Sequence, residues 1–292
     1  MFALVDGNAF YASCEQVFDP KLRRRPLVVL SNNDGCAIAR TDQAKALGVK
    51  MGQPAHELRE LQRNQGLVLR SANFALYGDM SRRMTEILRD AAPRIEVYSI
   101  DESFLDLTGV PDRMAFAHAL RERVGRWIGI PNCIGMGPTK TLAKLANRIA
   151  KRGAGVVDLS EHELRATMLA TFPIQDVWGV GAKWAAKLGQ LGISTAAALR
   201  DAPGKLIQDQ FGVVLRRTQC ELQGLSCIAL QEVEPDRQQI MVSRSFADRV
   251  TDHQAVAEAL ATFAERACEK LRARGLVAGA IGISAGTDTF RP

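Results

Sequence analysis

The sequence has no Cys-x-x-Cys pair, and its six cysteines are scattered over 292 residues. This distribution lacks the closely spaced ligands of a structural zinc site and the dense cysteine framework of a disulfide-stabilised domain. We therefore expect neither structural zinc nor a set of disulfides, and the cysteines are predicted to be reduced thiols.

Signals for export and for membrane insertion are also missing. Residues 1–6 do not begin the basic segment and long apolar core of a signal peptide. No apolar run is long enough to cross a bilayer, and the chain has no internal repeat and no low-complexity tract. These absences lead us to expect a soluble, cytoplasmic protein with no membrane partner.

The chain does have a large apolar content and a surplus of basic residues. Hydrophobic residues make up 47% of the sequence, which is enough for a substantial core, and 292 residues suggest more than one domain. The formal net charge of +6 favours a polyanionic partner such as nucleic acid, although many basic proteins bind none.

An acidic pair, Asp101 and Glu102, interrupts the apolar run of residues 94–107, which predicts two short strands joined by a turn. Neighbouring residues of a strand point to opposite faces, so both side chains share a target only if the chain bends there. One interpretation is a solvated hairpin tip. The other is a site for a hard divalent cation, which offsets the cost of desolvating two carboxylates.

A third acidic residue ends the first predicted strand. Residues 2–5 form a short buried strand that ends at Asp6 and Gly7. A strand-end Asp-Gly is commonly a turn. If the strands belong to one sheet, however, Asp6 joins Asp101 and Glu102. Three converging carboxylates are explained by two Mg²⁺ ions roughly 3.5–4 Å apart, the arrangement used for phosphoryl transfer.

Two glycine-containing stretches have both a functional and a packing interpretation. Residues 135–141 resemble a phosphate loop but lack the G-x-x-x-x-G-K-[ST] spacing. We interpret them as a connection from a strand to a basic helix over 139–152, whose lysines could meet phosphates. Residues 178–181 fit a helix-hairpin-helix turn, in which backbone N–H groups approach a DNA phosphate. Glycines that end helices for packing reasons explain the same pattern.

The remaining pattern predicts further elements. Residues 27–30 read as a buried strand, and residues 41–47, 77–91 and 114–128 as helices, the last with Leu120, Val124 and Trp127 on one apolar stripe. Ser160 and Glu163 have the spacing of a capping box that starts a helix. Towards the end, residues 240–250 and 276–284 read as strands around a helix over 255–274. This β-α-β unit stops at Pro292 and looks cut short.

Five ordered stretches resemble the Y-family of translesion DNA polymerases, and within it the UmuC type. They are residues 2–15, 31–36, 98–103, 139–147 and 176–181. The resemblance extends from Met1 to about Ser284. It departs from the family where Asn8 replaces a second Asp, and where Lys45 replaces an Arg of the fingers and so lacks the bidentate fork of that residue.

The resemblance implies an α+β, right-hand polymerase. A mixed-sheet palm would comprise residues 1–18 and 75–163, and small fingers residues 19–74. A helical thumb with the helix-hairpin-helix would span residues 164–231. A linker, 232–239, would lead to an incomplete β-α-β little finger at 240–292.

The resemblance also implies roles for single residues. Asp6, Asp101 and Glu102, with the Gly7 carbonyl, would hold two Mg²⁺ ions. Tyr11 matches the steric gate of the family, which excludes ribonucleotides by clash, and Phe10 lies beside it. The nucleotide contacts implied are Phe10, Tyr11, Arg40, Lys45 and Lys151. The DNA contacts implied are Lys140, Lys144, Gly179, Gly181, Lys183, Lys187 and Arg244.

The function implied is DNA-directed DNA synthesis on damaged templates, in SOS mutagenesis and DNA repair. The substrates would be primer-template DNA and deoxynucleoside triphosphates, and the partners a UmuD-type accessory dimer and RecA. Two alternatives stay open. A truncated, non-catalytic regulator would bind DNA or a partner without synthesis, and a two-metal nuclease would degrade the primer.

Overall fold

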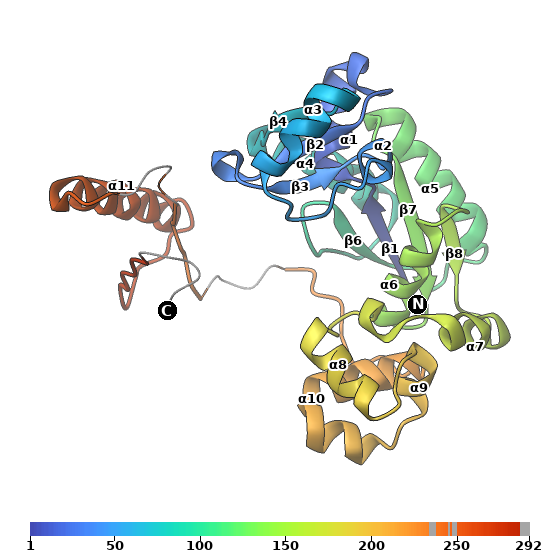
Figure 1. Cartoon of the computed structure of the whole chain (residues 1–292). Helices are drawn as coiled ribbons and strands as arrows, with labels where there is room; N and C mark the ends of the chain where they lie inside the picture. Colours follow the sequence, from blue (N-terminus) through green and yellow to red (C-terminus); the bar gives the residue numbers. More distant parts are fainter. Residues whose placement is uncertain (234–237, 245, 247–249, 287–292) are drawn as a thin grey trace. The chain divides into compact units, whose positions relative to one another are not determined.

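The computed structural model of the protein describes residues 1–233, 238–244, 246 and 250–286. The chain forms two compact units, Met1–Glu234 and Pro235–Pro292, which are drawn in Figure 1. The first unit combines two mixed β-sheets with helices, which confirms the predicted α+β class. No helix in the described ranges is long and apolar enough to cross a membrane.

The first unit is built on a five-stranded main sheet with strand order β5-β6-β1-β7-β8. Its strands are β1 (Phe2–Gly7), β5 (Ile95–Val97), β6 (Glu102–Asp106), β7 (Asn132–Gly137) and β8 (Val156–Asp158). The central strand β1 is antiparallel to both β6 and β7, and β7 is parallel to β8. The two predicted strands around the acidic turn are β5 and β6, which pair as an antiparallel hairpin.

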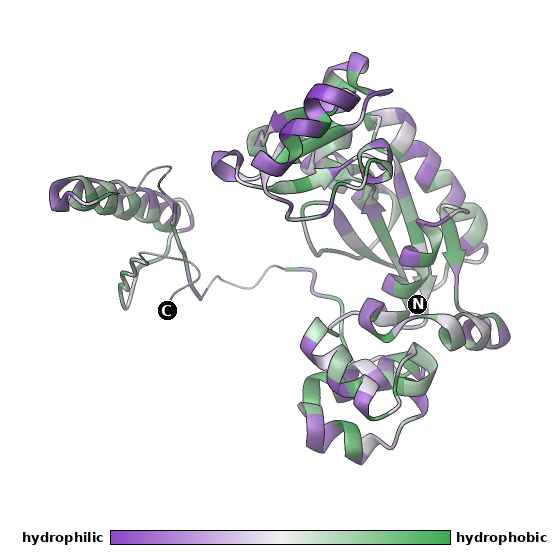
Figure 2. Cartoon of the chain, viewed as in Figure 1, coloured by the Kyte–Doolittle hydropathy of each residue, from purple (hydrophilic) through white to green (hydrophobic). Residues whose placement is uncertain are grey.

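The two faces of the main sheet pack against different helices. Ala3 and Val5 belong to the core shared with α1 (Phe10–Phe18), α4 (Phe74–Ala91) and α5 (Arg113–Ile128). Leu4, which points to the other face, packs with Phe104 and with Ala143 of α6 (Lys140–Ala150). In Figure 2 hydrophilic and hydrophobic residues alternate along these helices, as expected when one side of each faces a core.

The prediction that Trp127 of α5 faces the core is wrong. Leu120 and Val124 are buried as expected, but 63% of Trp127 is exposed. Its indole lies under the guanidinium of Arg123, 5.6 Å from the ring centre. Trp127 follows Val124 by three positions and lies at the edge of the apolar stripe, where the helix has already turned towards solvent.

A second, smaller sheet has strand order β3-β2-β4 and a core of its own. Its elements are β2 (Leu27–Leu30), β3 (Ala37–Arg40), α2 (Asp42–Ala46), α3 (Arg59–Gln65) and β4 (Val68–Ser71). Thr41 caps α2, since its hydroxyl accepts the Ala44 N–H. Short 3₁₀ helices lie at Pro20–Leu22, Asn32–Asp34 and Ala55–Leu58.

The rest of the first unit is helical. It consists of α7 (His162–Thr171), the 3₁₀ turn Ile174–Asp176, α8 (Ala182–Gln190), α9 (Ala196–Asp201) and α10 (Gly204–Leu222). The capping box predicted at Ser160 is wrong, because α7 starts after Glu161 with no side-chain cap. The Ser160 hydroxyl instead accepts a hydrogen bond from Arg113.

Residues 227–232 run from α10 back over the main sheet and are fixed there by buried carboxylates. Glu221, fully buried, accepts the Cys227 and Ile228 N–H groups at 2.7 and 3.1 Å. Glu96 accepts the Gln231 N–H at 2.7 Å and pairs with the ammonium of Lys140. The attachment extends to Glu232, the first residue of the predicted linker, whose carboxylate pairs with Arg94 at 2.8 Å. Residues 234–237 of that linker lie outside the described residues.

The second unit contains α11 (His253–Arg272), which confirms the helix predicted at 255–274. The two flanking strands are wrong as far as they can be compared: residues 240–244, 246, 250 and 276–284 form no strand, and 245 and 247–249 lie outside the described residues. Alternating apolar residues form a strand only beside a partner strand. Two short segments are too few to make a stable sheet by themselves.

Candidate active site

The main sheet brings the three predicted carboxylates together. In the antiparallel pairing of β1 with β6, Asp6 lies directly opposite Glu102. Asp101 lies next to this pair, because its carbonyl accepts the Gly7 N–H at 2.9 Å. Strand residues alternate between faces, so Asp6 points to the same side as Leu4, the side that α6 covers.

Each carboxylate has a partner within the protein. The ammonium of Lys151, which follows α6, lies 2.6 Å from Asp6 Oδ2, and that of Lys144 lies 2.7 Å from Glu102 Oε1. The Ser99 hydroxyl donates to Asp101 Oδ1 at 2.7 Å. Lys144 and Lys151 are seven positions apart, two turns of helix, so α6 and its C-cap present both to the same two interior strands, β6 and β1.

Asp6 is the most perturbed of the three acids. Burial raises the pKa of its carboxyl from the ordinary 3.8 to about 7, although the Lys151 ammonium opposes this rise and Glu102 and Asp101 add to it. Its Oδ2 binds Lys151, but its Oδ1 is buried without a hydrogen-bond partner among the described residues. A buried acceptor without a donor is costly, and a cation would relieve that cost.

The donor set fits a hard divalent cation. All candidate ligands are oxygen atoms, two of the carboxylates lie opposite each other on adjacent strands, and Asp6 offers an unpartnered oxygen. The carboxylates are nevertheless turned to Lys151, Lys144 and Ser99. In the described part of the chain no three His, Cys, Asp or Glu side chains are gathered tightly enough to hold a metal ion. Binding a shared ion therefore requires the carboxylates to exchange these partners.

The raised pKa of Asp6 predicts a pH-dependent cost to stability. Because its folded-state pKa lies above its unfolded value, the protein loses stability as the pH rises from about 4 to about 7, by up to about 1.4 kcal/mol per pH unit. Asp6→Asn is neutral throughout. In urea unfolding with a chelator present, the free energy of unfolding of the variant should therefore rise relative to that of the wild type between about pH 4 and about pH 7. Above about pH 7 the difference between the two proteins should stay constant. Parallel pH curves for the two proteins would contradict the raised pKa.

An aromatic wall borders the acidic residues. Tyr11 of α1 stacks on Tyr77 with ring centres 4.5 Å apart and meets Phe74 edge to face at 6.0 Å. Burial raises the pKa of Tyr11, and the charge of Asp101 raises it further, so the phenol lies within electrostatic reach of the acidic turn. The predicted contact of Phe10 with the nucleotide is not retained. Phe10 is 3% exposed and packs so closely on Gly7 that a Cβ there would lie 2.7 Å from its ring.

The other predicted nucleotide contacts are divided between two places. Lys151 lies at the carboxylates, paired with Asp6. Arg40 and Lys45 belong to the smaller sheet and its helix α2. There Arg40 donates to the Val49 carbonyl at 2.7 Å, and Lys45 pairs with Asp42.

Two of the predicted DNA contacts, both on α6, face the protein. Lys140 is 2% exposed, pairs with Glu96 and donates to the Ala229 carbonyl, so its ammonium faces the protein interior and is unavailable to DNA. Lys144 also faces the protein, at Glu102. The N-terminal residue of a helix lying on a sheet is readily buried, and the helical period alone does not show which lysines face solvent.

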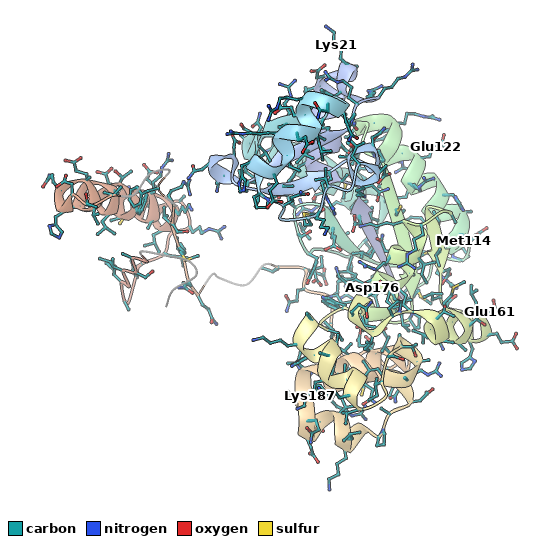
Figure 3. All side chains as sticks on the ribbon, in the orientation of Figure 1. Lys21, Met114, Glu122, Glu161, Asp176 and Lys187 are labelled. Carbon is teal, nitrogen blue, oxygen red and sulfur yellow. The ribbon has the colours of Figure 1, made fainter. Side chains whose placement is uncertain are left out.

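The remaining predicted DNA contacts are exposed. Gly179 adopts φ +85°, which favours glycine, and Gly181 precedes the first turn of α8. Lys183 and Lys187 extend from α8, and Lys187, labelled in Figure 3, donates to the Gln210 carbonyl at 3.0 Å. Arg244 lies in the second unit, where it donates to the Ser243 carbonyl.

Sequence reasoning missed the partners of the acidic residues. It assigned Lys144 to DNA and gave no site role to Ser99, Tyr98, Phe104 or Trp178, although the first, second and fourth lie in stretches that it noted and all four border the same site. The seven-residue spacing of the two lysines was the available signal, since it places them on one side of a helix next to the predicted acidic strands.

Comparison with known proteins identifies the family. The model of the impB/mucB/samB family matches residues 5–148, and the model of the C-terminal domain of that family matches residues 237–291. Protein SamB of Salmonella typhimurium is 46% identical over 298 residues, covering 99% of this chain and 70% of the relative. Protein UmuC of the same species is 48% identical over 279 residues, covering 93% of this chain and 66% of the relative.

A solved structure shows the same fold. A Y-family DNA polymerase chimera built from Dbh and Dpo4 superimposes with a TM-score of 0.73 at 24% identity, over 92% of this chain and 80% of that one. The chain spans about two thirds of the length of the curated relatives it matches. With nearly half of its residues identical to UmuC and SamB, the chain belongs to the impB/mucB/samB family, as a UmuC-type member with the fold of the Y-family DNA polymerases.

Proposed function

We propose that this protein is a template-directed DNA polymerase of the translesion type. The observation that carries the proposal is the pairing of Asp6 with Glu102 across β1 and β6, with Asp101 beside them. Two carboxylates on strands and a third in the adjoining turn, bordered by the Tyr11 wall, suit a reaction between a primer hydroxyl and a nucleoside triphosphate. The family relationship supports the same activity.

In this proposal Asp6, Asp101, Glu102 and the Gly7 carbonyl would hold two Mg²⁺ ions, which when bound would supply Lewis-acid stabilisation of the attacking and leaving oxygens. The chain orients these ligands through the β1–β6 register, and Lys151 is placed to contact the triphosphate once it leaves Asp6. Arg40 and Lys45 neutralise further triphosphate charge from the smaller sheet. The two exposed lysines of α8, the Gly179–Gly181 turn and Arg244 contact the DNA backbone.

The proposed domains follow the observed sheets. The main sheet with α1, α4, α5 and α6 is the palm, the smaller sheet the fingers, α7 to α10 the thumb, and the second unit part of the little finger. Primer-template DNA and deoxynucleoside triphosphates are the proposed substrates. A cytoplasmic role in SOS mutagenesis and DNA repair, with a UmuD-type dimer and RecA as partners, follows from the family resemblance.

Primer extension with purified protein, Mg²⁺ and all four deoxynucleoside triphosphates tests the proposal. Extension is expected on intact templates and across a damaged base. A second candidate, a non-catalytic DNA-binding regulator, is favoured by the pairing of the three carboxylates with Lys151, Lys144 and Ser99, which turns them away from a shared metal ion. Salt-dependent DNA binding without extension would establish that candidate, and primer shortening would indicate a nuclease.

Tyr11→Ala is expected to admit ribonucleotides. Tyr11 is held by its stack on Tyr77 and by Phe74, so its ring is a rigid obstacle to a 2′-hydroxyl. Removing the ring should raise ribonucleotide incorporation relative to deoxynucleotide by about 10²-fold or more, the size of effect expected when a steric exclusion is lifted.

The measurement is single-nucleotide insertion with matched ribo- and deoxynucleotides. Tyr11→Phe is the control, because it keeps the ring and loses only the hydroxyl, and its selectivity should stay close to that of the wild type. Unchanged selectivity in Tyr11→Ala would remove the gate role.

A further inference from the structure

Lys144 lies at the meeting point of a carboxylate and three aromatic rings. Its ammonium is 2.7 Å from Glu102 Oε1, 4.4 Å from the ring centre of Tyr98 and 5.5 Å from that of Trp178. The ring of Phe104, fully buried, lies 5.9 Å away. With 15% of the Lys144 side chain exposed, the ammonium is shielded from water, and ring faces attract such a cation.

The three rings form one cluster. Tyr98 and Trp178 meet edge to face with centres 5.7 Å apart, and Phe104 contacts both, at 5.6 and 6.2 Å. We call Tyr98, Phe104 and Trp178 the aromatic cage. Such packing fixes the rings relative to one another, so the position of any one of them affects the space left for the ammonium.

The rings of the cage come from different parts of the first unit. Tyr98 precedes the acidic turn, and Phe104 follows Glu102 on β6. Trp178 directly precedes Gly179, whose φ of +85° forms the glycine turn before α8. The ammonium of Lys144 therefore contacts the carboxylate on one side and the ring that begins the glycine turn on the other.

Stability alone is a weak reason for this arrangement. A mostly buried ion pair is often no more stabilising than apolar side chains of the same volume. Here an apolar residue in place of Lys144 would fill the cage equally well. The charge makes a difference at Glu102, where it fixes the orientation of a carboxylate that lies opposite Asp6.

We propose that Lys144 is a positioning residue for Glu102, and that the aromatic cage makes the orientation of Glu102 depend on the glycine turn at Trp178. The inference rests on the proposed function for its role in DNA synthesis. DNA bound at the glycine turn would then change the orientation of Glu102 through two side chains, the Trp178 ring and the Lys144 ammonium. A divalent cation that binds Glu102 competes with that ammonium.

A tryptophan signal tests the proposal without any synthesis. The chain has three tryptophans, so Trp127→Phe with Trp184→Phe leaves Trp178 as the single emitter, beside the ammonium. Titration with Mg²⁺ alone should change its emission as the ammonium leaves Glu102. With Lys144→Met added, the change should disappear. A calorimetric titration of the same variant should show Mg²⁺ binding about 3- to 10-fold more tightly, because one positive charge is gone.

Matched variants separate positioning from general damage. Lys144→Arg keeps the charge and should retain the emission change, and Lys21→Met, an exposed lysine of the 3₁₀ helix Pro20–Leu22, should behave as the wild type. Circular dichroism melts confirm that each variant is folded. Either of two results would overturn the proposal. One is a Trp178 emission that does not change on addition of Mg²⁺ when Lys144 is present. The other is a Lys144→Met variant that keeps both the emission change and the Mg²⁺ affinity measured with Lys144 present.

Single-turnover extension gives the second readout. Lys144→Met should slow the maximal rate by about 10- to 100-fold without changing the nucleotide concentration at half-maximal rate, as expected when a supporting contact to a ligand residue is lost. Lys144→Arg should restore much of the rate, and Trp178→Leu should be slower than Trp178→Phe. Equal rates in all four variants would refute the role in synthesis. If the wild type extends no primer, the proposed function fails, while the Mg²⁺ titration still decides whether Lys144 positions Glu102.

Discussion

Primer extension by an Asp101→Asn variant is expected to fall by about 10²- to 10³-fold, because the proposed metal site would lose one of its three carboxylate charges, and losing one preorganised electrostatic contact costs about this much. The substitution keeps the size and shape of the side chain. Its amide oxygen can still accept the Ser99 hydroxyl, and its backbone carbonyl still accepts the Gly7 N–H. The fold is therefore preserved while one negative charge next to Asp6 and Glu102 is lost.

Asp106→Asn is the matched control. Asp106 ends the same strand, β6, at the end away from Glu102, where it pairs with Arg94. An exposed ion pair of this kind contributes up to about 1 kcal/mol, so this variant should extend primers at nearly the wild-type rate. DNA binding measured by fluorescence anisotropy should be similar in all three proteins. If Asp101→Asn extends a primer as well as the wild type, the assignment of the metal ligands is wrong.

The acidic site was accessible from sequence because it depends on local patterns. Residues 2–5 and 94–107 have the apolar runs of buried strands, and Asp6 and the pair at 101–102 stand at their ends. The structure places these ends side by side through the β1–β6 register. A continuous apolar run predicts a strand well when both faces of the strand are covered, as they are for β1.

The partners of the basic residues could not be predicted from the sequence, because they depend on which strand lies opposite each turn of α6. Lys140, Lys144 and Lys151 look alike in sequence, yet the first meets Glu96, the second Glu102 and the third Asp6. All three acids lie on other elements, at least 40 positions away. Helical periodicity gives the relative direction of side chains and carries no information on the partner across a tertiary contact.

The second unit shows the same limit for strands. Its helix α11 forms as predicted because helical hydrogen bonds are internal to the segment. Strand hydrogen bonds need a neighbour, and residues 276–284 have none within the part of the second unit that the structure describes. Apolar side chains there stay exposed, with Val277 at 94% and Ile281 at 86%.

Gly135→Ala is expected to be among the most destabilising single substitutions in this protein. Gly135 lies in β7 where α6 crosses it, and a Cβ would lie 2.0 Å from the Asn147 backbone N and 2.4 Å from the Ala143 carbonyl. Both obstacles are backbone atoms of a helix, so no side chain can turn away to make room. We expect a loss of at least about 3 kcal/mol in the free energy of unfolding, in the range of severe overpacking.

Gly78→Ala is the matched control, since Gly78 lies on an exposed side of α4 with nothing within 4 Å of a new Cβ. There alanine favours the helix and should raise stability by about 0.5–1 kcal/mol. Urea unfolding followed by circular dichroism measures both effects. The close approach at Gly135 also lets the Asn147 amide donate to the carbonyls of Leu4 and Cys133, which fixes α6 on the sheet. Because α6 brings Lys144 and Lys151 to the carboxylates, the fraction of Gly135→Ala protein that still folds should have an altered Mg²⁺ affinity. A variant with wild-type stability and wild-type Mg²⁺ affinity would contradict the close packing of α6 on β7.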